Sequence, residues 1–174
     1  MGGYSSEVNI SLKSGNVVYN HLDKEKYTLF RVCIFKDKWV ALDDSEIEYP
    51  INKSDFSFVL NGKQIIFDCA FNAIHGAPGE NGMLLAYFNL INMKHTSAPF
   101  YQMALTFNKR DTLSVVKEYG IKTATSVYLN KGVDIDVNQI IQKVGLPCFV
   151  KPNNAGSSYG ISKVYTKEEL LPAI

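Results

Sequence analysis

The sequence has 174 residues, of which 46% are hydrophobic, so the chain is long enough to bury a core as one large domain or as a domain and part of another. Its formal net charge is +1 and its basic residues are scattered, a pattern that is not typical of nucleic-acid-binding or membrane-surface proteins. The chain has no apolar run long enough to span a bilayer and no signal-peptide pattern at its start. We therefore expect a globular protein with neither a nucleic acid nor a membrane as its partner.

The three cysteines indicate a reducing environment. Cys33, Cys69 and Cys148 are odd in number, lack metal-ligand spacing and stand inside apolar, strand-like runs. We expect all three to be buried thiols, and the protein to be cytoplasmic.

The first half of the chain reads as alternating helices and strands. Residues 2–7 form a turn-and-cap sequence before a helix, and glycines in that position let a helix start receive an anion or a charged ligand. The helix is predicted at 10–22. Strands are predicted at 27–35 and 38–42, and a hairpin at 56–60 and 64–67 across the turn 61–63.

A second buried strand is predicted at 68–74, and it ends in the glycine- and proline-rich segment 75–82. The C-terminal ends of strands in open α/β sheets are where such folds place their binding crevice, so His75 is a candidate site residue. The pattern alone also fits a histidine that is satisfied at a strand end. The helix predicted at 81–92 packs on the sheet as core.

The second half begins with an irregular link at 94–106 that contains Pro99. Asn108 is the expected cap of a helix at 109–119 that ends at Gly120. Lys109 and Arg110 fall in the first turn of this helix, where the helix dipole disfavours cations, partly offset by an acidic neighbour. Their positions suit an anionic partner, although exposed basic side chains usually reach into water.

The remaining elements of the second half come in chain order. They are a strand at 126–129, a helix at 137–144 closed by Gly145, a strand pair at 148–150 and 161–164, and a last helix with a capping box of Thr166 and Glu169.

The loop between the last two strands has the composition of a phosphate-binding loop. Gly156 and Gly160 let the backbone approach a ligand closely, and the hydroxyls of Ser157 and Ser158 can donate hydrogen bonds to oxyanions. Lys151 leaves the first strand and is expected to point at this loop. A Walker loop is excluded because no Gly-Lys-Ser/Thr follows the glycines. Taken alone, the pattern also fits a plain hairpin turn.

Four segments in this order resemble the D-alanine-D-alanine ligase family of the ATP-grasp superfamily. They are residues 2–15, 75–82, 104–109 and 149–160. The resemblance implies an enzyme that phosphorylates the carboxylate of one D-alanine with ATP and lets the amine of a second displace phosphate, which gives the dipeptide used in peptidoglycan precursors.

The resemblance also implies a role for each matched residue. Glu7 would hold the ammonium of the first D-alanine, and His75 would lie near the substrate carboxylate. Lys109 and Lys151 would neutralise the ATP phosphates. Ser157 would bond into the substrate site and position the lid formed with Gly156, Ser158 and Gly160, whose closure excludes water.

The chain departs from the family pattern in two places. Asn108 stands where the family usually has aspartate, and residues 153–155 read Asn-Asn-Ala where Ser-Arg-Glu is common. Against the family pattern, a first strand ahead of Gly2 and the C-terminal half are absent from the sequence. That half carries the Mg²⁺ ligands and a transition-state arginine. We therefore expect Mg²⁺ and ATP as cofactors, no metal ligands in this chain, and no dipeptide synthesis by this polypeptide alone.

The expected fold is α/β. Residues 1–97 would form a doubly wound, mostly parallel sheet that binds substrate, and 98–174 the start of an α+β ATP-grasp lid. A chain beginning at Met1 is expected to be poorly stable, or to form an oligomer that supplies a replacement strand. The resemblance implies a homodimer. Two alternatives remain: a non-catalytic nucleotide- or amino-acid-binding module, and a ligase that joins D-alanine to D-lactate or D-serine.

Overall fold

The computed structural model describes residues 1–174, and the chain forms two compact units, Met1–Leu105 and Thr106–Ile174. The division falls near the end of a helix, α3 (Phe100–Phe107). Apolar helices of membrane-crossing length do not occur in the structure.

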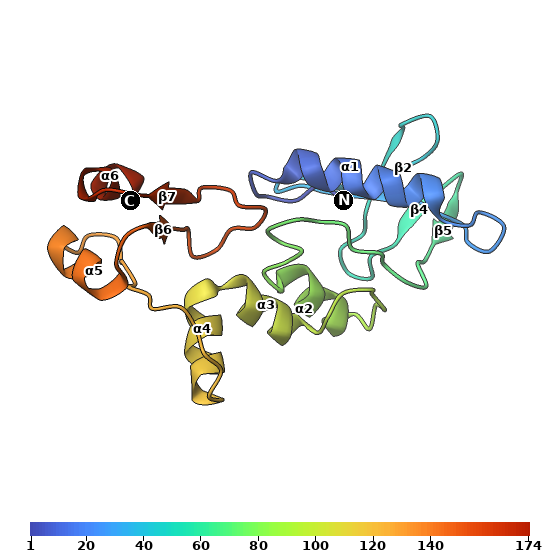
Figure 1. Ribbon diagram of the computed structural model, residues 1–174. Helices are drawn as coiled ribbons and strands as arrows, with labels where there is room; N and C mark the ends of the chain where they lie inside the picture. The colour runs from blue at the N-terminus through green and yellow to red at the C-terminus, as the bar shows by residue number, and fades with distance from the viewer. The chain divides into compact units, whose positions relative to one another are not determined.

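Unit 1 contains one long helix, a small antiparallel sheet and a hairpin. Figure 1 shows α1 and α2 on opposite sides of the unit. Its elements are α1 (Val8–His21), β1 (Arg31–Ile34), β2 (Trp39–Leu42), β3 (Glu48–Pro50), β4 (Phe58–Leu60), β5 (Lys63–Ile65) and α2 (Met83–Leu90). The sheet has the order β1-β2-β3, and β4 pairs with β5 across the predicted Asn61–Gly62 turn.

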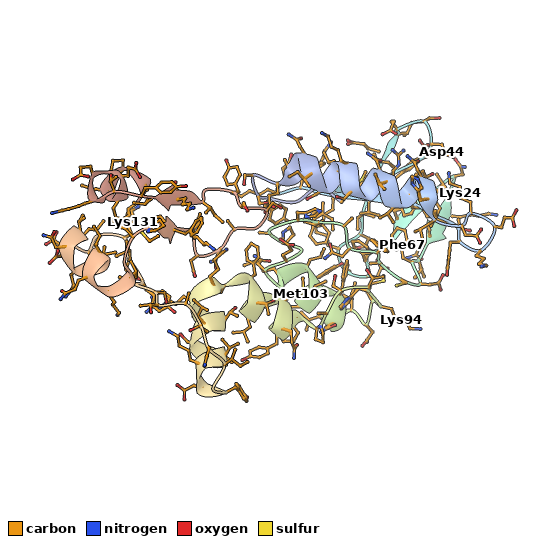
Figure 2. The ribbon with its side chains drawn as sticks, viewed as in Figure 1. Lys24, Asp44, Phe67, Lys94, Met103 and Lys131 are labelled. Carbon is orange, nitrogen blue, oxygen red and sulfur yellow. The ribbon has the colours of Figure 1, made fainter.

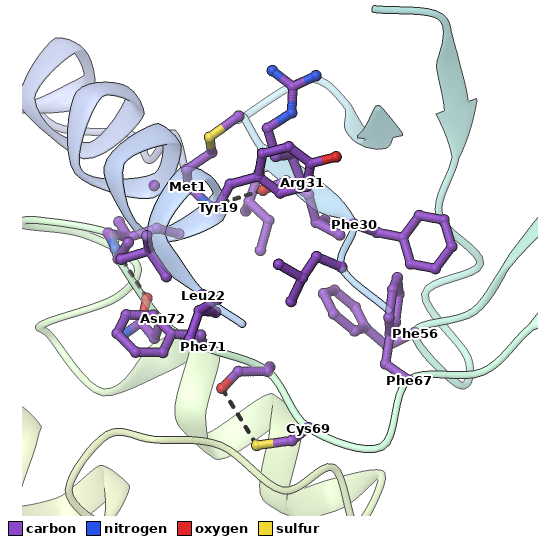
Figure 3. A pocket seen from close by; sticks show the side chains of 18 of the residues that line it. Met1, Tyr19, Leu22, Phe30, Arg31, Phe56, Phe67, Cys69, Phe71 and Asn72 are labelled. Carbon is purple, nitrogen blue, oxygen red and sulfur yellow. Dashed lines mark hydrogen bonds between the residues drawn. The ribbon is translucent and has the colours of Figure 1, made fainter. Parts of the chain in front are cut away.

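The core of unit 1 is formed by α2, the sheet and an aromatic cluster. Leu85 and Phe88 of α2 are buried against Ile34 and Ala41 of the sheet. The Phe56 and Phe88 ring centroids lie 4.9 Å apart in an edge-to-face arrangement, which stabilises aromatic pairs beyond their buried area. Phe67, labelled in Figure 2, packs against this cluster, with its ring centroid 5.5 Å from that of Phe56. Both rings line the cavity that is drawn in Figure 3.

The α/β class is confirmed, but most strand pairing in unit 1 is not parallel. All ladders are antiparallel, and parallel pairing is limited to two isolated bridges, Gly2 with Ile34 and Ala70 with His95. The apolar runs predicted where strands form but carried no information about their direction. The short connections between β1, β2 and β3 permit only antiparallel neighbours.

Several predicted boundaries in unit 1 are wrong. The strand expected at 27–35 begins only at Arg31, and Tyr27 is 56% exposed. The run 68–74 is extended but forms no ladder, and Phe71 is 52% exposed. Cys69, in the same run, is exposed rather than buried, whereas Cys33 is buried and Cys148 is half-buried.

The predicted link at 94–106 contains α3, which sequence reasoning missed. The carbonyl of Pro99 accepts the first helical hydrogen bond, from the amide of Met103 at 3.1 Å. A proline at a helix start costs nothing because its missing N-H would be unpaired there. Pro99 therefore marks the beginning of a helix rather than an irregular segment.

Unit 2 consists of α4 (Lys109–Glu118), α5 (Val137–Val144), the hairpin β6 (Cys148–Val150) with β7 (Ser162–Val164), and α6 (Lys167–Ala173). Its core is built from Ile140, Val164 and Leu170. The Asn108 cap and the Thr166–Glu169 capping box are confirmed. The prediction of a strand at 126–129 is wrong, because this segment pairs with no other strand.

Candidate functional site

The segment before α1 is held between the end of β1 and the loop 75–80. The amide of Gly3 donates to the carbonyl of Ile34 at 2.7 Å, and the amide of Tyr4 donates to the carbonyl of Ala77 at 2.7 Å. These bonds join residues more than thirty and seventy positions apart in sequence. They place the start of α1 directly against the glycine-rich segment 75–82, in which the sequence predicted a binding crevice.

Glu7 is buried at this junction without a partner for one of its oxygens. The residue is 4% exposed and is the N-cap of α1, yet its side chain makes no capping bond. Its Oε1 is buried and has no hydrogen bond. A buried acceptor without a donor costs free energy, about 1 to 3 kcal/mol or more for a charged group. The carboxylate is therefore available to a ligand that brings a donor.

His75 is fixed by serines of α1. Its amide donates to Ser11 Oγ at 2.9 Å, and its Nε2 lies 3.0 Å from Ser14 Oγ. Its carbonyl accepts from Ser5 Oγ at 3.2 Å. Sequence reasoning missed these three serines as positioning residues. The spacing of Ser11 and Ser14, three apart on one helix face, was the available signal.

Gly76 brings the Glu7 and His75 segments into close approach. A Cβ at this position would collide with the Ser5 side chain and lie 3.1 Å from Glu7 Oε2, and its φ of +72° favours glycine. The Gly76 amide donates to Glu80 Oε2 at 2.7 Å, a role for Glu80 that the sequence did not reveal. The structure thus brings the two predicted residues of unit 1 together.

In unit 2, the start of α4 is joined to the loop after β6. Lys109 Nζ donates to the carbonyl of Ala155 at 2.5 Å, and the amide of Arg110 donates to Asn153 Oδ1 at 2.9 Å. Asn153 Nδ2 in turn donates to Asn108 Oδ1 at 2.9 Å. Both departures from the family pattern, Asn108 and the segment 153–155, therefore lie in one hydrogen-bonded contact.

The ammonium of Lys151 lies over the ring of Phe149, its neighbour on β6. Its Nζ lies 5.4 Å from the centroid of the Phe149 ring, within cation-π range. Lys163 is the partner of Phe149 on the other strand of the hairpin, and its Nζ is 5.9 Å from the same ring. An exposed lysine gains contact area by lying along a neighbouring ring.

The loop itself exposes several unpaired donors. Ser157 and Ser158 have φ values of 47° and 59°, a conformation that non-glycine residues seldom adopt and that clusters at binding sites. Their amides and hydroxyls, and the amide of Gly160, make no hydrogen bond in the structure. Consecutive free amides of this kind form concavities that suit anions. Gly156 accepts the amide of Tyr159 at 2.9 Å, which closes the turn.

No group of three or more histidine, cysteine, aspartate or glutamate side chains is placed to hold a metal ion. The residues present therefore do not form a cage of protein ligands for Mg²⁺, which usually takes one or two carboxylates and substrate phosphates.

Family comparison matches the chain in two segments. Residues 1–98 match the model of the D-ala D-ala ligase N-terminus, and residues 115–174 match that of the D-ala D-ala ligase C-terminus. The first match covers more than half of the chain.

Individual relatives agree with this match. A D-alanine--D-alanine ligase of Flavobacterium johnsoniae is 63% identical over 174 residues, which is all of this chain and 54% of that protein. The crystal structure of D-alanyl-alanine synthetase A from Vibrio cholerae superposes with a TM-score of 0.83 at 25% identity, and the match covers 99% of this chain and 52% of that one. The VanG D-Ala:D-Ser ligase of Enterococcus faecalis gives a TM-score of 0.74 at 27% identity over 99% of this chain and 56% of that one.

The chain spans about half the length of the curated relatives it matches. Its two matched segments follow each other in the order of the family models. The Flavobacterium johnsoniae relative, which is 63% identical, aligns with this chain over the whole length of this chain. On these grounds the chain belongs to the D-alanine-D-alanine ligase family.

Proposed function

We propose that this chain supplies the first-substrate site and the ATP lid of a D-alanine-D-alanine ligase. The observation that carries the proposal is the buried, unpartnered carboxylate oxygen of Glu7 beside His75. In this reaction the carboxylate of one D-alanine attacks the γ-phosphate of ATP. The amine of a second D-alanine then displaces phosphate from the acyl phosphate, and D-alanyl-D-alanine, ADP and phosphate are released for peptidoglycan synthesis.

Glu7 binds the ammonium of the first D-alanine in this proposal. An ammonium supplies both the donor that Oε1 lacks and a compensating charge, so binding removes the cost of the buried carboxylate. Glycine at position 76 keeps the space beside Glu7 Oε2 open. Because the carboxylate is held by its backbone at the start of α1, the amino acid is oriented without further movement of the side chain.

His75 acts on the carboxylate end of the same substrate. Its Nε2 is engaged by Ser14 Oγ, which leaves Nδ1 without a protein partner. A ring nitrogen that carries a proton can donate to the negative charge that develops as the carboxylate reacts. Ser11 and Ser14 are then positioning residues, since they act through His75.

Lys109, Lys151 and the loop 156–160 bind the phosphates of ATP. Lys109 is already anchored to the loop through Ala155, so movement of the loop carries its ammonium along. The unpaired amides and hydroxyls of Ser157 and Ser158 would donate to phosphate oxygens, with Gly156 and Gly160 flanking them. Ser157 would also bond into the substrate site. Closure of this lid excludes water and protects an acyl phosphate from hydrolysis.

Mg²⁺ belongs to the proposed reaction, since it neutralises the charge that develops on the phosphates. This chain gathers no group of three or more carboxylate, histidine or cysteine side chains to hold it. That the 174-residue polypeptide alone makes no dipeptide stays a prediction. Three further expectations also stay predictions: the cytoplasmic location of the protein, its homodimeric state, and its division into domains 1–97 and 98–174.

A ligase that uses a different second substrate is the second candidate function. The likeness to the VanG D-Ala:D-Ser ligase favours testing D-serine in the acceptor position. D-lactate is the further acceptor to test.

The experiment is an assay of the full-length enzyme with ATP, Mg²⁺ and D-alanine, in which ADP and dipeptide are quantified together. We expect ADP and D-alanyl-D-alanine in equal amounts, and little mixed product when D-serine or D-lactate is added as a competing acceptor. Binding of ATP and D-alanine without any ligated product would instead support a non-catalytic binding module.

A further inference from the structure

The loop after β6 is bound to the start of α4 through one asparagine, Asn153. The amide of Lys109 donates to the main-chain carbonyl of Asn153 at 3.2 Å, and the amide of Arg110 donates to its Oδ1 at 2.9 Å. Asn153 Nδ2 donates to Asn108 Oδ1 at 2.9 Å and to Asn154 Oδ1 at 3.2 Å. Both polar atoms of this side chain are therefore in use, and most of its bonds go to the start of α4.

These bonds complete the hydrogen bonding of the first turn of α4. The amides of the first three residues of an α-helix have no acceptor within the helix. Asn108, the cap residue, accepts the amide of Asp111 at 3.0 Å. Asn153 accepts the amides of Lys109 and Arg110, which come before it. The first turn of α4 therefore has no free amide to offer to a phosphate, and side chains must bind the anion there.

The start of α5 shows what a cap residue does without such a partner. Asp136 Oδ1 accepts the amide of Gln139, the third of that helix, at 3.0 Å. The amides of Val137 and Asn138 make no hydrogen bond within the protein. A helix can therefore begin with its first two amides exposed to water, and α4 does not need Asn153 in order to form. The added bonds instead fix the loop and the helix against each other.

The segment 153–155 holds Lys109 at both ends. The amide of Lys109 bonds to the carbonyl of Asn153, and its Nζ donates to the carbonyl of Ala155 at 2.5 Å. A free lysine side chain has several rotatable bonds, and a ligand that binds it must restrict them at a cost in entropy. A lysine that is already held has less freedom to lose when an anion arrives.

Backbone groups determine which way the Asn153 amide faces. A backbone N-H can only donate, so the atom that accepts from Arg110 is oxygen, and the atom that meets Asn108 is nitrogen. Asn108 is oriented in the same way by the amide of Asp111. An ionised aspartate at position 153 would still accept from Arg110, but it has no proton to donate to Asn108 Oδ1. The position therefore needs one acceptor and one donor.

We propose that Asn153 is a positioning residue for ATP, which places the ammonium of Lys109 against the phosphates by tying the loop to the first turn of α4. The inference rests on the proposed function, in which Lys109 binds phosphate. Asn153 is exposed, so water replaces its bonds when the side chain is shortened and little stability is lost. The loss falls on the position of Lys109, and therefore on contacts with the phosphates rather than with the nucleoside.

The test compares Asn153→Asp with Asn154→Asp in the full-length enzyme. Both variants add one negative charge to the same part of the loop, but Asn154 Oδ1 only accepts, from Asn153, and an aspartate can still do so. We expect Asn153→Asp to raise the KM for ATP at least about fivefold more than Asn154→Asp does. The KM for D-alanine and the inhibition constant of adenosine, which carries no phosphate, should stay unchanged.

Two further variants complete the series. Asn153→Ala adds no charge and should raise the KM for ATP as Asn153→Asp does, and Lys109→Met tests the lysine itself. If Lys109→Met raises this KM while both Asn153 variants match Asn154→Asp, the positioning role alone is overturned. If Lys109→Met leaves it unchanged, the assignment of Lys109 to the phosphates fails, and the role of Asn153 fails with it. An equal rise in the inhibition constant of adenosine would mean that the whole lid is disturbed, which also contradicts the proposal.

Discussion

Glu7 differs from the hydrogen-bonded carboxylates of unit 1 in what surrounds it. The amide of Ile47 donates to Asp43 and holds the pKa of that carboxyl below its usual value, and the Ser57 hydroxyl does the same for Asp55. Both aspartates are satisfied by their own neighbours in the turns they stabilise. Glu7 is more buried than either and keeps Oε1 without a donor. An acceptor left unpaired in this way is a feature of a binding site rather than of a turn.

The close approach at Gly76 gives a prediction for stability. Substitution of Gly76 by alanine places a Cβ against the Ser5 side chain at a φ of +72°, and we expect the free energy of unfolding to fall by about 2 to 3 kcal/mol. Gly62 is the matched control, because its φ of +75° is similar but nothing lies within 4 Å of an added Cβ. Gly62→Ala should cost only about 1 kcal/mol, from backbone strain alone.

Urea unfolding of both variants measures the difference. An equal loss of stability in the two proteins would show that packing around Gly76 is looser than the structure describes.

Substitution of each of the two lysines beside the Phe149 ring distinguishes a role in ATP binding from a role in packing. Lys151 and Lys163 lie at 5.4 and 5.9 Å from its centroid, so either substitution by methionine removes a cation-π contact with Phe149, and Lys163→Met also removes the contact with the Tyr165 ring. Only Lys151 is proposed to bind phosphate. In the full-length enzyme, Lys151→Met should raise the KM for ATP at least about tenfold, the size of one charge-assisted hydrogen bond. Lys163→Met should leave it unchanged, and similar KM values for the two variants would refute the assignment.

At the level of elements, the residue before α4, Asn108, both caps the helix and bonds to the loop after β6, and two substitutions distinguish these roles. Asn108 Oδ1 accepts from the amide of Asp111 at 3.0 Å as a helix cap, and it also accepts from Asn153 Nδ2 of the loop. Asp136 Oδ1 caps α5 in the same way, at 3.0 Å from the amide of Gln139, without any loop contact in the structure. Each substitution by alanine should lower the free energy of unfolding by about 1 kcal/mol.

Only Asn108→Ala should also free the loop. We expect faster proteolysis between residues 153 and 160 and weaker ATP binding in this variant, and neither change in Asp136→Ala. If both variants were cleaved at the same rate as the parent, the contact through Asn153 would have no part in ordering the loop.

The helix ends were predictable from sequence, and the isolated strands were not. Asn108, Gly145 and the pair Thr166–Glu169 act on amides or turns within a few residues, so their effect is contained in the local sequence. The segments 68–74 and 126–129 have strand composition but lack a ladder partner, and a partner is a property of the fold. The same distinction applies to the site. Glu7 and His75 stood in recognisable motifs, whereas the serines that hold His75 became visible only when α1 was placed against the loop.

For the whole molecule, the buried amine of Met1 makes stability depend on pH. Its pKa is about 6 in the folded chain and 8.0 when unperturbed, so between these values the unfolded chain binds the extra proton. Stability therefore rises as the pH increases from 6 to 8, by about 2 kcal/mol from this group. Urea unfolding at both pH values checks the rise.

The matched control is the same chain with an acetylated amino terminus, which cannot titrate there. Any pH dependence due to other groups is common to both proteins, so the difference between them isolates Met1. The same slope in the acetylated chain would exclude the amine as its cause.

The central claim is that the buried carboxylate of Glu7 binds the ammonium of D-alanine, and steady-state kinetics of a Glu7→Gln enzyme tests it most directly. The amide keeps the shape of the side chain but removes its charge, and the exposed Glu25→Gln serves as control. The account predicts a KM for D-alanine raised by about 10-fold or more in Glu7→Gln, with the KM for ATP unchanged. An unaltered KM for D-alanine in this variant would contradict it.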